Sequence, residues 1–107
     1  MLEWKTLTLS VSAGAQGSTE WAPERDITIR KILVREESGN SLLDVHAKIE
    51  ISDTPMTRET IPLDLLDAEW NQVPELNYKL PKGVKIKFTV SNDSSAAVAL
   101  RIVLAYE

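Results

Sequence analysis

Apolar residues recur at every second position along most of this 107-residue chain. This spacing is typical of a β-strand with one buried face, because successive side chains of a strand point to opposite sides. The clearest run alternates with polar and charged residues and contains Leu43, Val45, Ala47, Ile49 and Ile51. The period of two therefore predicts an all-β protein.

Turn residues separate this strand from four further alternating segments, 6–12, 26–36, 76–90 and 96–106. Segment 13–24 is small and polar and contains Pro23, so we expect a loop that holds Trp21. The turn at 81–83 predicts a hairpin between strands 76–80 and 84–90. The tripeptide 92–94 matches the acceptor pattern for N-glycosylation at Asn92, but we interpret it as a turn.

Within segment 26–36 the alternation changes phase. Ile27 and Ile29 occupy odd positions, whereas Ile32 and Val34 occupy even ones. One inserted residue that swaps the faces is a β-bulge, which bends a long strand as the corner of a sandwich requires. The alternative is a strand that is apolar on both faces, since Leu33 continues the odd series.

The stretch from 53 to 78 is the least regular part of the chain. Pro62, with Leu63, Leu66 and Trp70 at helical spacing, predicts a short helical segment near 62–70, and an extended loop is the alternative. The length of the chain fits one domain, residues 1–107. We predict an antiparallel β-sandwich of about seven or eight strands.

Composition and charge argue against catalysis and nucleic-acid binding. The chain has no cysteine, which excludes disulfides and thiolate chemistry, and its net charge of −4 repels phosphate backbones. The only histidine, His46, alternates onto an outward face among charged residues, so we interpret it as a solvated strand residue rather than a general base. We predict no enzyme activity, no catalytic residue, no metal and no cofactor.

Two clusters of charged residues have alternative interpretations. The carboxylates of Asp64, Asp67, Glu69 and Glu75 are candidates for calcium ligands, but their spacing matches no calcium loop, which favours a solvated acidic surface. The second cluster is basic and contains Lys79, Lys82, Lys85 and Lys87. Protection of a sheet edge is favoured there over contact with an anion or a membrane surface.

The last strand is apolar on both faces. Its even positions predict the core side, and its odd positions carry one charge, Arg101, among small apolar residues. A second apolar face suggests cover by a neighbouring subunit, with a covering loop or a bare patch as alternatives. The predicted oligomer interface consists of Ala97, Ala99, Val103 and Ala105.

Three of the six aromatic residues are tryptophans, and all three lie in or beside expected loops: Trp4, Trp21 and Trp70. An indole in such a loop stacks on a sugar ring or anchors a protein interface, because it combines a large rigid area with a polar tip. Capping the open ends of the sandwich is the alternative use. These residues are the candidate contacts for a glycan or a protein partner.

From Trp21 to Glu107 the order of features resembles small jelly-roll proteins of virus particles, such as capsid, decoration and fibre-head subunits. The resemblance rests on Trp21-Ala-Pro-Glu leading into Asp26-Ile-Thr-Ile, on the irregular segment 61–70, on Leu80-Pro-Lys-Gly83, and on the apolar strand ending at Tyr106. It implies a jelly-roll-like sandwich and assembly into trimers or larger rings. The sandwich is also similar to carbohydrate-binding modules, whose tryptophans stack on sugars.

We therefore expect a structural subunit that self-associates through sheet faces and edges, with other virion proteins as further partners. A carbohydrate-binding module is the alternative. No window approaches the ~20 apolar residues that span a bilayer, and the first residues lack a signal-peptide pattern. The expected location is a virion or the cytoplasm, with neither a membrane nor a nucleic acid as partner.

Overall fold

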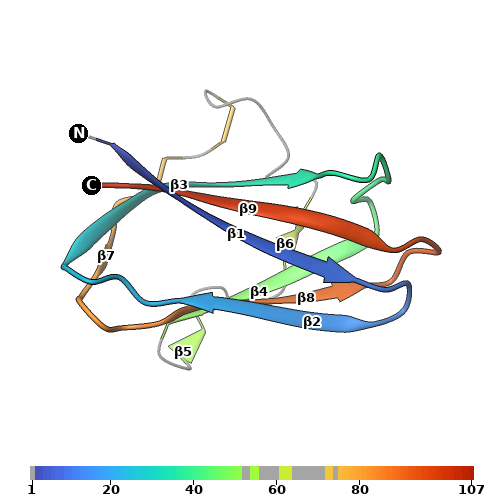
Figure 1. The fold of residues 1–107 in the computed structure, drawn as a ribbon, viewed down its shortest axis with the longest axis horizontal. Helices are drawn as coiled ribbons and strands as arrows, with labels where there is room; N and C mark the ends of the chain where they lie inside the picture. The colour runs from blue at the N-terminus through green and yellow to red at the C-terminus, as the bar shows by residue number, and fades with distance from the viewer. Residues whose placement is uncertain (1, 52–53, 56–60, 64–71, 74) are drawn as a thin grey trace.

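The computed structural model describes residues 2–51, 54–55, 61–63, 72–73 and 75–107, which form two packed antiparallel sheets (Figure 1). Sheet A has the order β1 (Glu3–Val11), β9 (Val98–Tyr106), β3 (Ile27–Glu36) and β7 (Tyr78–Leu80). Sheet B has the order β2 (Gln16–Trp21), β8 (Ile86–Asn92), β4 (Val45–Ile51) and β5 (Thr54–Pro55), and β6 (Ile61–Pro62) also pairs with β4. The predicted all-β antiparallel sandwich is confirmed.

One hydrophobic core lies between the sheets, and alternation along the strands supplies it. In β4 the inward residues from Val45 to Ile51 are buried as predicted. Leu43 was expected on the same face, but the strand begins only at Val45, whose amide donates to the Leu42 carbonyl at 3.1 Å. The prediction for Leu43 is therefore wrong: it is 66% exposed, and Leu42 is buried in its place.

The predicted β-bulge is present in β3. Ile29 pairs with Tyr106 and Lys31 with Ala105, so Arg30 is the extra residue. The bulge lets Ile29 and Ile32 both face the core despite their odd spacing. Leu33, on the opposite face, is also buried, so β3 combines the bulge with the two-sided burial that was its alternative.

The loop predicted over 13–24 is wrong over 16–21, because β2 lies there and pairs with β8 along its whole length. The inward residues of β2 are Gly17, Thr19 and Trp21, which do not make an aliphatic alternation. Gly17 is needed where β1 and β2 approach closely. A Cβ atom at this position would lie only 3.3 Å from a methyl group of Val11.

The hairpin predicted around 81–83 is also wrong, because its two strands belong to different sheets. β7 pairs with β3 in sheet A, whereas β8 lies between β2 and β4 in sheet B. The turn therefore crosses between the sheets. It closes with a hydrogen bond of 3.1 Å from the Val84 amide to the Pro81 carbonyl, and the Gly83 amide donates to the Pro23 carbonyl at 3.0 Å.

The helical segment expected near 62–70 is wrong at its first residue, because Pro62 lies in an extended strand. Ile61 and Pro62 form β6, opposite Ala47 and His46 of β4. Residues 64–70, including Trp70, lie outside the described residues. In the described part of the chain no helix is long and apolar enough to cross a membrane.

Candidate functional site

The outer face of sheet A carries the predicted interface residues of β9. In the register of the sheet, Ala105 lies between Trp4 and Lys31, and Val103 lies between Thr6 and Leu33. Ala99 and Val103 are partly exposed on this face, and Ala97 is exposed just before the strand.

Ala105 does not belong to the accessible part of the predicted interface, because it has no exposed surface in the chain itself. Its methyl group stands between two much longer side chains of neighbouring strands, and a short side chain in that position is screened from solvent. The part of the predicted interface that a partner can reach therefore consists of Ala97, Ala99 and Val103.

Trp4 projects on the same outer face. It is 55% exposed, and among the described residues only Leu43 is also a large exposed hydrophobic residue. The two lie at opposite ends of the sandwich, since Trp4 is in register with Ala105 whereas Val45 is in register with Asn92. Among the described strands, β1 pairs only with β9, so Trp4 stands on an edge strand.

A second surface is a recess of about 700 Å³ at the end of the sandwich where both termini lie (Figure 1). Trp21, the last residue of β2, and Tyr106, the last residue of β9, line it with ring centroids 5.4 Å apart and planes tilted by 45°. Pro23 lies two residues beyond Trp21 and prevents the strand from continuing, because proline has no amide for the ladder. Strands β1 and β2 are close at Gly17 and diverge toward this end, which leaves the recess open.

Charged side chains surround the two rings. The Lys5 ammonium lies 6.0 Å from the ring centre of Trp21, and the Arg25 guanidinium lies 5.8 Å from that of Tyr106. Arg25 also forms an ion pair with Glu3, and Glu24 lines the same recess. Two cations and two carboxylates therefore face the recess, and their formal charges cancel.

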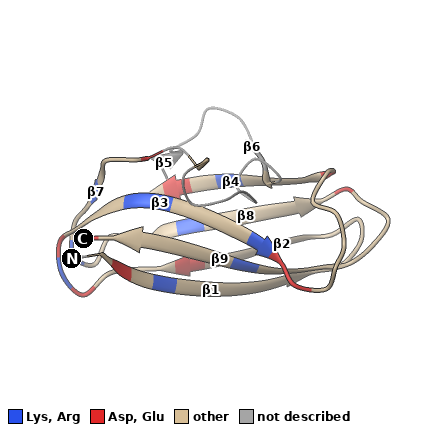
Figure 2. Cartoon of the chain, turned by 90° about the horizontal axis from the view of Figure 1, so that it is seen from above, with Lys and Arg blue, Asp and Glu red and all other residues tan. Residues whose placement is uncertain are grey.

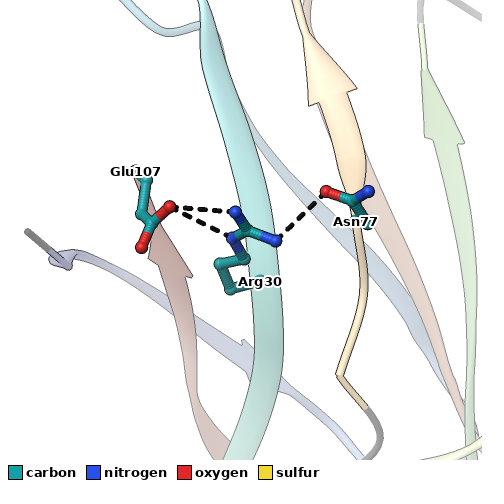
Figure 3. A network of polar contacts seen from close by, with 3 residues as sticks. All are labelled: Arg30, Asn77 and Glu107. Atoms are coloured by element: carbon teal, nitrogen blue, oxygen red, sulfur yellow. Dashed lines mark hydrogen bonds and ion pairs between the residues drawn. The ribbon is translucent and has the colours of Figure 1, made fainter.

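A polar network joins the bulge to the end of the chain (Figure 3). Arg30 donates to the Glu107 carboxylate at 2.9 and 3.3 Å and to the Asn77 side-chain oxygen at 3.1 Å. The backbones of Thr28 and Glu107 exchange two hydrogen bonds beside it. These contacts hold β3, β9 and the segment before β7 together, so we interpret the network as structural.

The Asn92 side chain is fully buried, which decides between the glycosylation site and the turn that its sequence allows. Its amide nitrogen donates to the carbonyls of Val11 at 3.1 Å and Ala96 at 2.9 Å, and its oxygen accepts from the amide and hydroxyl of Ser94. A nitrogen with both hydrogens engaged in the interior is not available for glycosylation. Asn92 is the polar centre of a turn, as its sequence context predicts.

The basic cluster of the sequence is dispersed in the fold, and Figure 2 shows charged positions over both sheets. Lys79 lies in sheet A, while Lys85 pairs with Glu20 at 3.4 Å and Lys87 stands between Glu20 and Glu50 in the register of sheet B. The predicted basic patch is therefore not one surface.

The remaining candidates are His46 and the acidic residues of the irregular segment. His46 is partly exposed on β4, opposite Ser91. Asp64, Asp67 and Glu69 lie outside the described residues. Among the residues that are described, no group of three His, Asp or Glu side chains is placed to hold a metal ion.

Sequence reasoning identified Trp21 but not its neighbours in the recess. The alternation places Tyr106 only on the inner face of the last strand, and no sequence pattern marks Arg25 or Glu3 as a site residue. The recess residues come together only because β1, β2 and β9 meet at one end of the sandwich. The one sequence signal for this site is an aromatic residue on the inner face at the end of a strand.

No protein-family model matches this chain, and no curated protein matches its sequence. The candidate sites of the described structure are therefore the outer face of sheet A and the recess.

Proposed function

We propose that the protein is a non-enzymatic assembly subunit, of a virion or a comparable particle, that self-associates through the β1 edge and the outer face of sheet A. The observation that carries this proposal is Trp4, which is 55% exposed on the outer face of an edge strand. A large exposed indole on the same sheet face as partly exposed apolar residues is typical of a protein interface.

The strand order supports the resemblance to jelly-roll virion proteins. The chain passes from one sheet to the other between β1, β2, β3 and β4, and again between β6, β7, β8 and β9. A jelly roll likewise consists of two sheets whose strands alternate along the chain. The function implied by that resemblance is packing against symmetry mates in a closed assembly.

The β1 strand suits pairing with a second copy. It is nine residues long, contains no proline, and carries hydroxyl groups at Thr6, Thr8 and Ser10 on the face of Trp4. Natural edge strands that avoid pairing are usually short, bulged or protected by charges. An antiparallel pair of β1 strands centred on Leu7 would place Trp4 opposite Ser10, with no like charges facing each other.

Burial of the Trp4 indole contributes to the free energy of association. Covering its exposed half removes roughly 100 Å² of apolar surface from water, which is worth about 2.5 kcal/mol per copy. A β1 pair of this kind is two-fold symmetric and closes as a dimer, so a larger assembly needs a second, different contact, and Ala99 and Val103 on the outer face of sheet A are the proposed one.

The test is the mass of the protein in solution, measured by sedimentation and light scattering. We expect the native chain to be a homo-oligomer and Trp4→Glu to shift its mass toward that of the monomer. Leu43→Glu is the matched control, because it changes the other exposed hydrophobic residue, at the opposite end of the sandwich, and should leave the mass unchanged. Circular dichroism checks that both variants are folded.

Two results would overturn the proposal. One is a native chain that stays monomeric at the highest concentration that remains in solution. The other is an oligomer whose mass Trp4→Glu and Leu43→Glu alter equally.

A further inference from the structure

The recess beside Trp21 has the dimensions and lining of a site for a small molecule. Its volume of about 700 Å³ falls within the range typical of such sites, roughly 300–1,000 Å³. Trp21 and Tyr106 are both only partly buried, and each packs against the core on one side. The core therefore holds the two rings in place while part of each remains accessible.

The charges of the recess indicate what kind of ligand it suits. Lys5 and Arg25 are balanced by Glu3 and Glu24, so neither an anion nor a cation gains from the net field. The same four groups offer hydrogen-bond donors and acceptors around an aromatic floor. A neutral ring with an apolar C–H face and a rim of hydroxyl groups suits both the balanced charge and the polar groups around the aromatic floor.

We infer that this recess binds a neutral sugar ring, as a monosaccharide or as one unit of an oligosaccharide. Trp21 forms the stacking platform, and Arg25 and Glu3 bind the ring hydroxyls through charge-assisted hydrogen bonds. Trp4 takes no part, because it projects from the other face of β1. The site needs no second copy of the chain, because all the residues that line it belong to one chain.

The groups over the rings leave room for this arrangement. Lys5 and Arg25 approach the aromatic faces only at about 6 Å, and the Arg25 side chain is 55% exposed. Arg25 is therefore a long side chain that a ligand can displace sideways, from the ring of Tyr106 to a sugar hydroxyl, without moving the backbone.

The experiment screens the full chain on a glycan array that contains neutral and acidic sugars, and then titrates retained neutral sugars while the tryptophan fluorescence is recorded. We expect binding of at least one neutral glycan, accompanied by a fluorescence change that Trp21→Phe removes. Arg25→Ala should weaken binding about 10- to 100-fold, as expected for the loss of a hydrogen bond from a charged group.

The variants separate a binding role from a structural one. Trp21 contacts the core, so its replacement can unfold the protein, whereas Arg25 is exposed and its replacement leaves the core intact. Trp4→Glu is the matched control and should bind the sugar as tightly as the native chain, whatever its mass in solution. That comparison keeps failure of the sugar site distinct from failure of the assembly proposal.

Three outcomes would overturn the inference. They are the absence of any glycan binding, binding only of acidic glycans in a salt-sensitive manner, and binding of a neutral glycan that neither Arg25→Ala nor Trp21→Phe affects.

Discussion

Glu36, at the end of β3, shows how one side chain organises a loop. Its carboxylate accepts hydrogen bonds from the amides of Ala99 and Asn40, at 2.6 and 2.9 Å, and from the Ser38 hydroxyl at 2.6 Å. Desolvation raises the pKa of Glu36, but the hydrogen bonds from Ser38, Ala99 and Asn40 together lower it below its ordinary value of 4.5. The charged form therefore fastens the loop to the start of β9.

This lowered pKa makes part of the stability depend on pH. A carboxyl whose pKa is lower in the folded state binds fewer protons there than in the unfolded state, so its contribution is present above about pH 4.5 and is lost as the pH falls through the folded pKa. We expect Glu36→Gln to reduce the free energy of unfolding at pH 7 and to reduce it less at pH 3, as measured by urea denaturation.

The neighbouring Glu37→Gln is the control, because it removes an equal charge from an exposed ion pair with Arg101. Exposed pairs of this kind contribute little to stability. A loss of stability in Glu36→Gln that is the same at both pH values would contradict the assigned role of its hydrogen bonds.

Among the elements, the turn between β7 and β8 has a strict backbone requirement. Gly83 adopts a φ of +78°, and an added Cβ atom would meet no other group within 4 Å. A substitution there is therefore opposed by the backbone conformation alone and not by crowding. The turn is important because it carries the chain from sheet A to sheet B.

We expect Gly83→Ala to lower the free energy of unfolding by about 1 kcal/mol, because L-residues are strained in the left-handed region. Gly83→Asn should cost less, since asparagine tolerates that region better than alanine does. Chemical denaturation of the three proteins measures the difference. An alanine variant as stable as the native chain, or an asparagine variant less stable than alanine, would contradict this account.

For the molecule as a whole, β1 separates two surfaces. Its outward residue Trp4 belongs to the outer face of sheet A, whereas Glu3 and Lys5 line the recess on its other side. The side chains proposed for self-association and for ligand binding therefore lie on different faces of one strand. At the opposite end of the sandwich, the buried side chain of Asn92 joins the end of β1 to the segment before β9.

Self-association should also appear in the thermal stability. If the native state forms oligomers and the unfolded state does not, mass action raises Tm as the protein concentration increases. We expect Tm of the native chain to rise with concentration in calorimetry, and Tm of Trp4→Glu to stay nearly constant. A concentration-independent Tm for the native chain would argue against assembly through this surface.

Local pattern was sufficient for the parts of the fold that depend on near neighbours. The buried positions of β4, the inner face of β9 and the bulge at Arg30 all follow from the alternation of apolar residues and from its change of phase. Strand β2 was missed because Gly17, Thr19 and Trp21 present no aliphatic alternation. The exposed Leu43 was misassigned because the pattern extends beyond the point where pairing begins.

Local pattern does not specify which strands pair with one another. An inward face of leucine, isoleucine and valine is buried equally well against several strands, so alternation predicts burial but not pairing. The assignment of β7 and β8 to different sheets, the screening of Ala105, and the meeting of Trp21 with Tyr106 all depend on contacts between distant parts of the chain. Alternation thus established the β-sandwich from the residues alone, while the packing of the two sheets established which surfaces are left for function.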